Sequence, residues 1–235
     1  MNNLIIFILE FRNPKLIMKI LRLLHLTLFF SLTVSVVKAQ FQPGMGYHGP
    51  IGVMPRLAIN SGDVEGLRGV TSVNIIYDYS KLAVDAFRDE QDYLTKMKET
   101  FKDSTKFQKF RQNWFKQRKN YFEPNFEKAF NHLGKKIRME GTNHATTSPI
   151  TLKVETVLIE TGSNFRMFPS GPSSIDLECT FIDKDGKEIV RYFIKNAPGS
   201  ANDAESDFFD ALSDSYKKAA KMLMKDIKKR LKRMN

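Results

Sequence analysis

The chain has 235 residues, with 37 Lys and Arg against 26 Asp and Glu, a formal net charge of +11, and 19 Phe. This aromatic content argues against intrinsic disorder, because such a chain can bury enough apolar surface to fold. Cys179 is the only cysteine, which excludes an intrachain disulfide and leaves stability to ordinary packing.

An export signal is predicted over residues 18–39. It opens with the basic stretch "MKILR", continues through the apolar run Leu23–Val37, and ends in Val37-Lys38-Ala39 before Gln40. A basic start, an apolar segment of roughly 7–15 residues and small residues before the cut are typical of a secretory signal. His25 interrupts the run, which is shorter than the roughly 20 residues of a membrane-spanning helix. We therefore predict cleavage between Ala39 and Gln40.

Residues 1–17 precede a complete signal and are expected to be a mis-called upstream extension, with translation starting at Met18. Removing residues 1–39 takes away five basic residues and one acid, so the formal charge falls from +11 to +7. The remaining 196 residues suit a single domain. Cys179 does not follow the signal directly, so we expect a soluble exported protein, periplasmic or extracellular, that is not lipid-anchored.

Residues 40–68 are expected to form a leader in front of a single domain, residues 69–235. Its first part, residues 40–62, holds five Gly and three Pro without a helical or strand period, which is typical of an extended segment. The stretch from Gly69 to Ser80 is rich in Val, Ile and Tyr and predicts the first strand of the domain.

Helical patterns follow this strand. Asp89 predicts the N-cap of a helix that carries Tyr93 and Met97. Phe107, Phe110 and Trp114 mark a second helix, and apolar residues from Phe122 to Ile137 mark a third, with Pro124 in its first turn.

A strand is predicted over residues 148–162, and Asp185-Gly186 predicts a hairpin between two further strands. The chain then ends in an amphipathic helix with an apolar stripe from Phe209 to Ile227. The order strand, helices, strand, hairpin, helix indicates an α+β fold, with a mixed sheet of about four strands and long amphipathic helices packed against it.

Five residues are candidates for binding. Trp114 and Arg118 are one helical turn apart, so the guanidinium could stack on the only indole of the chain. Tyr77, Asp78 and Tyr79 end the first strand, where a crevice could open beneath the helices. If the two groups meet, they form a small polar-aromatic pocket; the alternative is that both are packing features whose polar tips are hydrogen-bonded.

Other chemistry has little support in the sequence. Asp183–Glu188 carries two Asp, a Glu and a Gly, but the strand patterns on both sides favour a hairpin turn over a calcium loop. His132 and His144 lack a second ligand at metal-binding spacing, and no nucleotide-binding or hydrolase motif is present. We therefore assign no metal site, cofactor or catalytic residue, and expect Cys179 to be a buried, inert thiol.

The last helix is strongly basic. Between Lys217 and Arg233 lie nine Lys and Arg and one acid, Asp226. Such a stretch could make weak contact with an anionic membrane surface. Cations at a helix C-terminus also oppose the helix dipole, which is a purely structural explanation. Export makes nucleic acid a poor candidate partner.

Several segments together resemble a known class of proteins: "YDYSKLAVDAF", the Trp and Arg of "WFKQR", "FEPNF", "TLKVETVLIETG" and the final amphipathic helix. They resemble an uncharacterised family of exported Gram-negative proteins. The order of elements over Gly69 to Arg233 is also similar to periplasmic modules such as the TolB amino-terminal domain and the curli-secretion and penicillin-binding-protein activator domains. That resemblance implies binding to other envelope proteins, and it assigns a role to no residue.

The expected function is therefore that of a non-catalytic envelope module that binds another envelope protein or a surface component through a sheet edge or a helix face. The alternative is an envelope hydrolase with an unrecognised active site. That alternative requires titratable groups such as Asp78, Glu123 and His132 to converge in one cleft.

Overall fold

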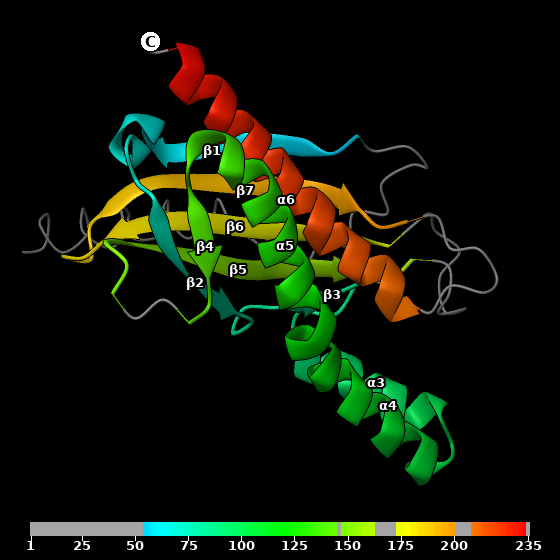
Figure 1. Ribbon diagram of the computed structural model, residues 1–235. Helices are drawn as coiled ribbons and strands as arrows, with labels where there is room; N and C mark the ends of the chain where they lie inside the picture. Colours follow the sequence, from blue (N-terminus) through cyan, green and yellow to red (C-terminus); the bar gives the residue numbers. More distant parts are fainter. Residues whose placement is uncertain (1–53, 145–146, 163–172, 201–207, 234–235) are drawn as a thin grey trace, which may run out of the picture. The chain divides into compact units, whose positions relative to one another are not determined.

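The structure, a computed structural model, describes residues 54–144, 147–162, 173–200 and 208–233 (Figure 1). All of them belong to one compact unit within Gly44–Asn235. The predicted signal, its cleavage site at Ala39-Gln40 and most of the predicted leader lie outside the described residues. None of the helices in these four ranges combines the length and the hydropathy that a membrane span requires.

A mixed sheet of seven strands forms the centre of this unit, so the predicted α+β class is confirmed and the expected number of about four strands is wrong. The strand order is β1-β7-β6-β5-β2-β4. The short strand β3 pairs with the later part of β5, beyond the residues of β5 that pair with β2. The pairs β2·β4, β2·β5 and β3·β5 are parallel, and the others are antiparallel. The strands are β1 (Arg56–Gly62), β2 (Ser72–Asp78), β3 (Ala83–Val84), β4 (Glu140–Thr142), β5 (Ile150–Glu160), β6 (Ser174–Asp183) and β7 (Glu188–Pro198).

The three strands that the sequence pattern did not indicate are short or lack alternation. The most consequential is β1, because it lies inside the segment expected to be an irregular leader and pairs along β7 from Arg56↔Lys195 to Gly62↔Val190. Its pattern is obscured by the Gly- and Pro-rich residues before it. Strands of two or three residues, such as β3 and β4, are too short to show a period of two.

The two faces of the sheet differ in chemistry. Along the long strands, most side chains of one face are apolar and fully buried, as with Val154, Cys179 and Tyr192. Their neighbours Lys153 and Arg191 point to the opposite face, because successive strand residues alternate between the two sides. The predicted hairpin between β6 and β7 is confirmed, and its Asp183 carboxylate accepts hydrogen bonds from the backbone N–H groups of Asp185 and Lys187, both at 2.9 Å.

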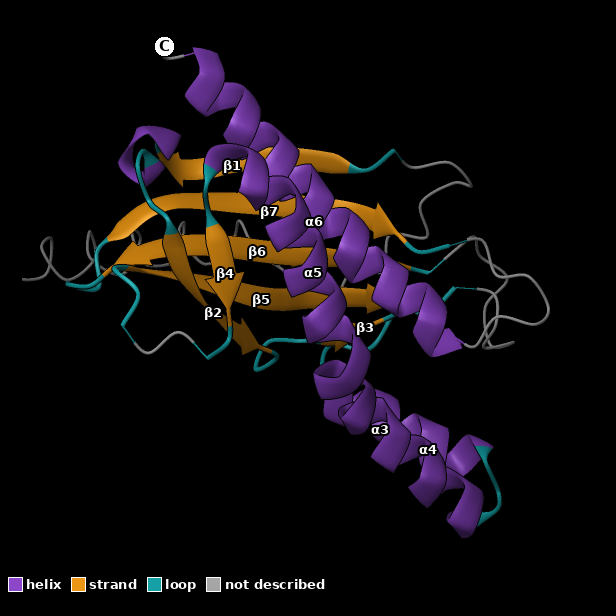
Figure 2. Cartoon of the chain, in the orientation of Figure 1, coloured by secondary structure: helices purple, strands orange, loops and turns teal. Residues whose placement is uncertain are grey.

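Helices α5 (Glu123–Gly134) and α6 (Phe208–Arg233) cover the apolar face (Figure 2). The predicted stripe of α6 is confirmed, because residues such as Leu212, Tyr216 and Leu223 are fully buried. The two helices run in the same direction. Asn125 donates to the Ser213 hydroxyl near the start of both, and a Cβ at Gly134, near the end of α5, would lie 3.6 Å from Met224 Cε.

A helical hairpin precedes α5 and consists of α3 (Glu90–Thr100) and α4 (Ser104–Gln117). The predicted N-cap is confirmed, since the Asp89 carboxylate accepts from the backbone N–H of Asp92 at 2.8 Å. Asp103 caps α4 in the same way. Between α4 and α5 the chain forms one π-helical segment, η2 (Arg118–Phe122), and Pro124 lies in the first turn of α5 as predicted.

Candidate functional site

Arg118 forms the centre of a buried polar-aromatic cluster beside the end of β2. Its guanidinium carbon lies 4.2 Å from the ring centroid of Tyr79 and 5.0 Å from that of Phe115. A second cation contacts the same ring: the guanidinium carbon of Arg111, one turn before Phe115, lies 5.7 Å from the centroid of the Phe115 ring. Only 9% of Arg118 is exposed, so these cation–π contacts occur largely out of water, where they are strongest.

Glu90, at the start of α3, supplies the counter-charge. Its carboxylate pairs with the Arg118 guanidinium and also accepts the indole N–H of Trp114. Trp114 is buried and packs against Tyr93, with ring centroids 5.2 Å apart. The carboxylate therefore joins α3 to the junction of α4 and η2.

The π-helical segment explains why this long side chain turns inward. A π turn holds one residue more per hydrogen-bonded turn than an α-helix and so rotates the following side chains, and such segments are frequent at functional sites. Here the segment begins at Arg118 and ends at Phe122, which stacks on Tyr216 of α6 at 5.1 Å between centroids. Both ends of the segment are thus fixed by ring contacts.

A second set of buried polar groups adjoins Arg118. The Tyr77 hydroxyl donates to the Glu123 backbone carbonyl at 3.1 Å, and the Tyr216 and Thr156 hydroxyls lie 2.9 Å apart. Burial raises the pKa of Tyr216 to about 12, and burial followed by the charge of Glu127 raises the pKa of Tyr77. These phenols are therefore neutral at physiological pH.

Buried atoms of this region that lack a hydrogen-bond partner among the described residues include the Tyr93 hydroxyl and Glu123 Oε1. The other oxygen of Glu123 accepts from Lys119 at 3.0 Å. Burial raises the pKa of Tyr79 well above its usual value, and the neighbouring Tyr216 and Glu123 act in the same direction. The cluster thus presents a neutral phenol, a cation and a carboxylate within one buried region.

The structure brings together Tyr79, Trp114 and Arg118 of the five candidate residues. Tyr77 lies nearby on the helix-covered face, packed edge-on against Phe126 at 6.0 Å between centroids. The rings over which Arg118 lies are those of Tyr79 and Phe115, whereas the expected partner was Trp114. Sequence reasoning missed Glu90, because it stands 28 positions from Arg118 and only tertiary packing joins them.

Asp78 belongs to the opposite face of the sheet. Its carboxylate lies 2.7 Å from Lys153 Nζ, and Lys153 also pairs with Glu155 at 2.7 Å. The Lys153 hydrogen bond lowers the pKa of Asp78 to about 2, so this carboxyl is ionised at physiological pH. Asp78 is therefore part of a charged ladder across β2 and β5, apart from the Arg118 cluster.

The groups that a hydrolase would need do not converge. Asp78 is on the face of the sheet opposite α5 and α6, whereas Glu123 is buried under these helices. His132 is exposed and lies nine residues along α5 from Glu123, which corresponds to about 13 Å of helix rise. Within the described ranges, no group of three or more His, Cys, Asp and Glu side chains is placed to hold a metal ion.

Strand β1 is the second candidate site, because it ends the sheet. Among the described strands it pairs only with β7. Leu57 and Ile59 are half-buried against the core, and Arg56, Ala58 and Asn60 are exposed. Met54, just before the strand, is 79% exposed. The strand at the other end of the sheet, β4, has only three residues.

Comparisons with known proteins leave the family open. No protein-family model matches the chain, and no curated protein matches it significantly. A PelC dodecamer from Paraburkholderia phytofirmans is similar over 73% of this chain and 98% of that one, with 11% identity and a TM-score of 0.36. Protein XCC0632 from Xanthomonas campestris, of family DUF330, is similar over 43% of this chain and 55% of its own length, with 12% identity and a TM-score of 0.27.

At TM-scores this low, neither likeness supports an argument about function. Neither protein is a TolB-type, curli-secretion or penicillin-binding-protein activator module by name. The resemblance to those modules therefore stays an expectation.

Proposed function

We propose that this chain is an exported, non-catalytic module of the cell envelope that binds another envelope protein by strand addition at β1. In strand addition, an extended segment of the partner pairs with an open sheet edge, and backbone hydrogen bonds supply the affinity. The observation that carries the proposal is the outer edge of β1, which has no partner strand among the described residues.

The composition of β1 supports this role. Natural edge strands are usually blunted by Lys, Pro or extreme shortness, because an open edge invites pairing. Here seven residues, Arg56 to Gly62, include one charge at the first position and no Pro. A bulge, which is one of the features that protect natural edges, lies in the second half of the strand, between Ile59 and Ser61. The regularly paired part of this edge that carries no charge is therefore Leu57 to Ile59.

A proline scan of β1 tests the proposal. Backbone N–H groups of an edge strand point alternately to the neighbouring strand and to solvent, so Ala58→Pro and Ile59→Pro address opposite sides. The variant that loses an outward N–H should keep the melting temperature and lose partner binding by about tenfold or more. The variant that loses the N–H directed at β7 should lower the melting temperature, because it loses a hydrogen bond of the sheet. Binding is measured by affinity capture from the native envelope, with mass spectrometry to identify the protein recovered.

Lys184→Pro is the matched control. Lys184 follows Asp183 in the β6–β7 turn, at the second turn position, which accepts Pro readily. This variant should capture the same partner in the same yield as the unmodified chain. Undiminished capture by both β1 variants would show that the edge is not the binding site.

A further inference from the structure

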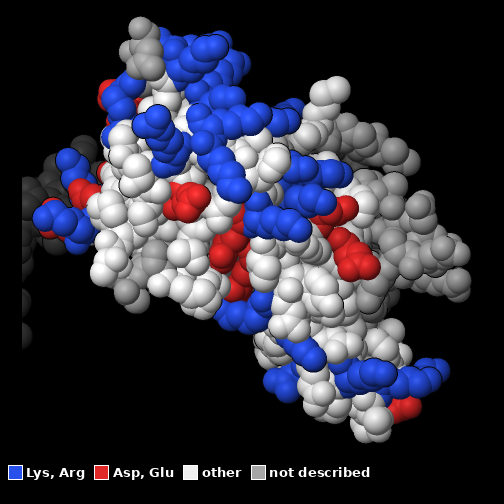
Figure 3. Space-filling model, viewed as in Figure 1, with Lys and Arg blue, Asp and Glu red and all other residues white. Residues whose placement is uncertain are grey.

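The parallel course of α5 and α6 brings two basic helix ends to the same side of the module. Gly134, at the end of α5, lies close to Met224 of α6, and Lys135 and Lys136 follow it in η3 (Lys135–Ile137). Figure 3 shows Lys and Arg gathered over the C-terminal half of α6. We define the basic helix surface as Lys135, Lys136, Arg138, Lys221, Lys225, Lys228, Lys229 and Lys232.

The charge of this surface is not neutralised locally. None of its eight side chains forms an ion pair within the described part of the chain. The acid nearest to them on α6, Asp226, pairs with Arg230 at 2.5 Å. The other acids of α6, Asp210 and Asp214, lie at the opposite end of the helix. No direct ion pair with a described residue therefore neutralises these eight cations, although Glu140 is exposed two residues after Arg138.

Helix-dipole compensation explains only part of this charge. The favourable effect of a cation at a helix C-terminus is confined to about the last turn. Lys221 and Lys225 lie two to three turns before Arg233, and they continue the same exposed side as Lys228 and Lys232. A row of unpaired lysines along several turns calls for an anionic partner rather than a structural role alone.

We infer that the basic helix surface lies against an anionic phospholipid membrane. Lys221 to Lys232 span about 16 Å of one straight helix, and the end of α5 widens this row, which suits an extended charged plane. All but one of the eight residues are Lys, whose compact charge suits diffuse attraction, whereas Arg favours bidentate recognition of single groups. Basic clusters attract anionic lipid by about 1 kcal/mol for each Lys or Arg near the surface.

Contact with such a membrane is peripheral. The large apolar side chains that are exposed in the described residues are Met54, Ile76, Phe115 and Tyr121, and none belongs to the basic helix surface. The attraction is therefore electrostatic, without insertion of a side chain, and it weakens as salt rises.

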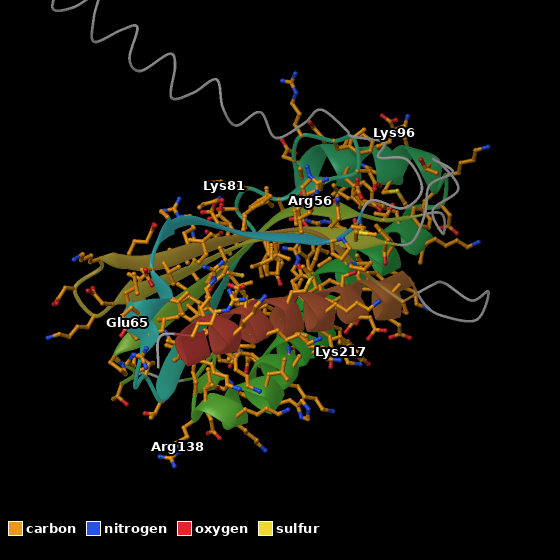
Figure 4. All side chains as sticks on the ribbon, turned by 90° about the horizontal axis from the view of Figure 1, so that it is seen from above. Arg56, Glu65, Lys81, Lys96, Arg138 and Lys217 are labelled. Carbon is orange, nitrogen blue, oxygen red and sulfur yellow. The ribbon has the colours of Figure 1, made fainter. Side chains whose placement is uncertain are left out.

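The orientation is compatible with a partner at β1. Arg138 and Lys217 lie on the side of the helices, while Arg56 and Lys81 lie on the side of the sheet (Figure 4). A module resting on its helix layer would leave the edge of the sheet accessible from the side. The membrane contact nevertheless rests on its own observation and stands if binding at β1 fails.

Vesicle co-sedimentation tests the inference with the protein made from the full reading frame. The probes are phosphatidylcholine vesicles with and without phosphatidylglycerol, at low ionic strength. Phosphatidylglycerol should increase binding above the phosphatidylcholine baseline. The variant Lys225→Gln/Lys228→Gln/Lys229→Gln should reduce this increase about tenfold or more, because three contacting charges are removed. Gln keeps the helix propensity of Lys, and circular dichroism verifies folding.

A matched variant separates location from total charge. Lys98→Gln/Lys106→Gln/Lys109→Gln removes three exposed charges from α3 and α4 and should leave binding within about twofold. Equal loss in both variants would overturn the inference, and so would binding that salt does not weaken. Heparin serves as a soluble polyanion, and binding to heparin without binding to phosphatidylglycerol vesicles would overturn the assignment to a membrane.

Discussion

Arg118 is buried between groups from separate parts of the chain, the Glu90 carboxylate of α3 and the Tyr79 ring that follows β2. Its spacing from Trp114 indicated that both lie on one side of a helix, and the structure places both against the same carboxylate, Glu90. The sequence could not indicate Glu90 or Tyr79, because each approaches Arg118 from a different element. The pairing of a buried charge depends on tertiary packing, and a single sequence carries little signal for it.

Replacing Arg118 by Met should lower the free energy of unfolding by about 2–3 kcal/mol. Removing one partner of a buried ion pair leaves the other charge uncompensated, and Glu90, whose side chain is 20% exposed, would retain only the Trp114 N–H. Urea unfolding measures this loss. Arg118→Met/Glu90→Gln should recover about 1 kcal/mol, because no charge then remains unpaired.

The control is Arg111→Met, which replaces an exposed residue and should change the free energy of unfolding by less than about 0.5 kcal/mol. Equal losses for Arg111→Met and Arg118→Met would contradict the role assigned to Arg118.

Asp176 predicts a pH dependence of stability. Burial raises the pKa of its carboxyl to about 6, although the Asn196 backbone N–H donates to it at 2.7 Å. In the unfolded chain the pKa is about 3.9, so folding favours the protonated form. The corresponding stability is fully present below about pH 4 and is lost as the pH rises through about 6.

Asp176→Asn should therefore raise the free energy of unfolding at pH 7.5 by about 2 kcal/mol, since the amide oxygen can still accept from Asn196. At pH 4 the advantage should vanish. Urea titrations at both pH values measure the difference. A variant less stable than the unmodified chain at pH 7.5 would show that the ionised carboxylate is needed.

At the scale of elements, the periodic segments were predictable and the short strands were not. Helix α6, the cap at Asp89 and the β6–β7 turn follow from local pattern and turn chemistry, and all three are present. Strand β4 is held by parallel pairing to β2, some 68 residues earlier. Such long-range pairing leaves no local signature in three residues, so the size of the sheet could not be predicted.

Gly134 gives a prediction at this scale. It has helical backbone angles at the end of α5, where Ala would ordinarily stabilise by about 1 kcal/mol. Here an added Cβ would lie 2.1 Å from the Met139 carbonyl oxygen, in the chain that leads into β4. Gly134→Ala should therefore destabilise by about 1–3 kcal/mol, because the backbone must shift.

Thermal unfolding compares Gly134→Ala with Lys128→Ala, an exposed change on the same helix that should stay within about 0.5 kcal/mol. A rise in melting temperature for Gly134→Ala would mean that the α5–β4 connection is not tightly packed.

At the scale of the whole molecule, the single thiol, Cys179, lies where we expect local opening of the fold not to expose it. Cys179 is fully buried at the centre of β6, which is flanked by β5 and β7 and is therefore remote from either end of the sheet. Burial, followed by the charge of Glu178, raises the pKa of the thiol and disfavours the reactive thiolate. Reaction should then require unfolding of the sheet, whose free energy is of the order of 5–15 kcal/mol for a domain.

Labelling with Ellman's reagent should be at least about 1000-fold slower in native buffer than in concentrated urea. Lys184→Cys in the exposed β6–β7 turn is the control, and one equivalent should react quickly while Cys179 stays protected. Because the rate reports opening of the sheet centre, Arg118→Met should accelerate labelling about tenfold for each 1.4 kcal/mol of unfolding free energy lost. Rapid labelling of the unmodified chain would indicate that β6 opens separately from the rest of the sheet. In that case the sheet would not be the rigid support that the edge β1 and the basic helix surface both require.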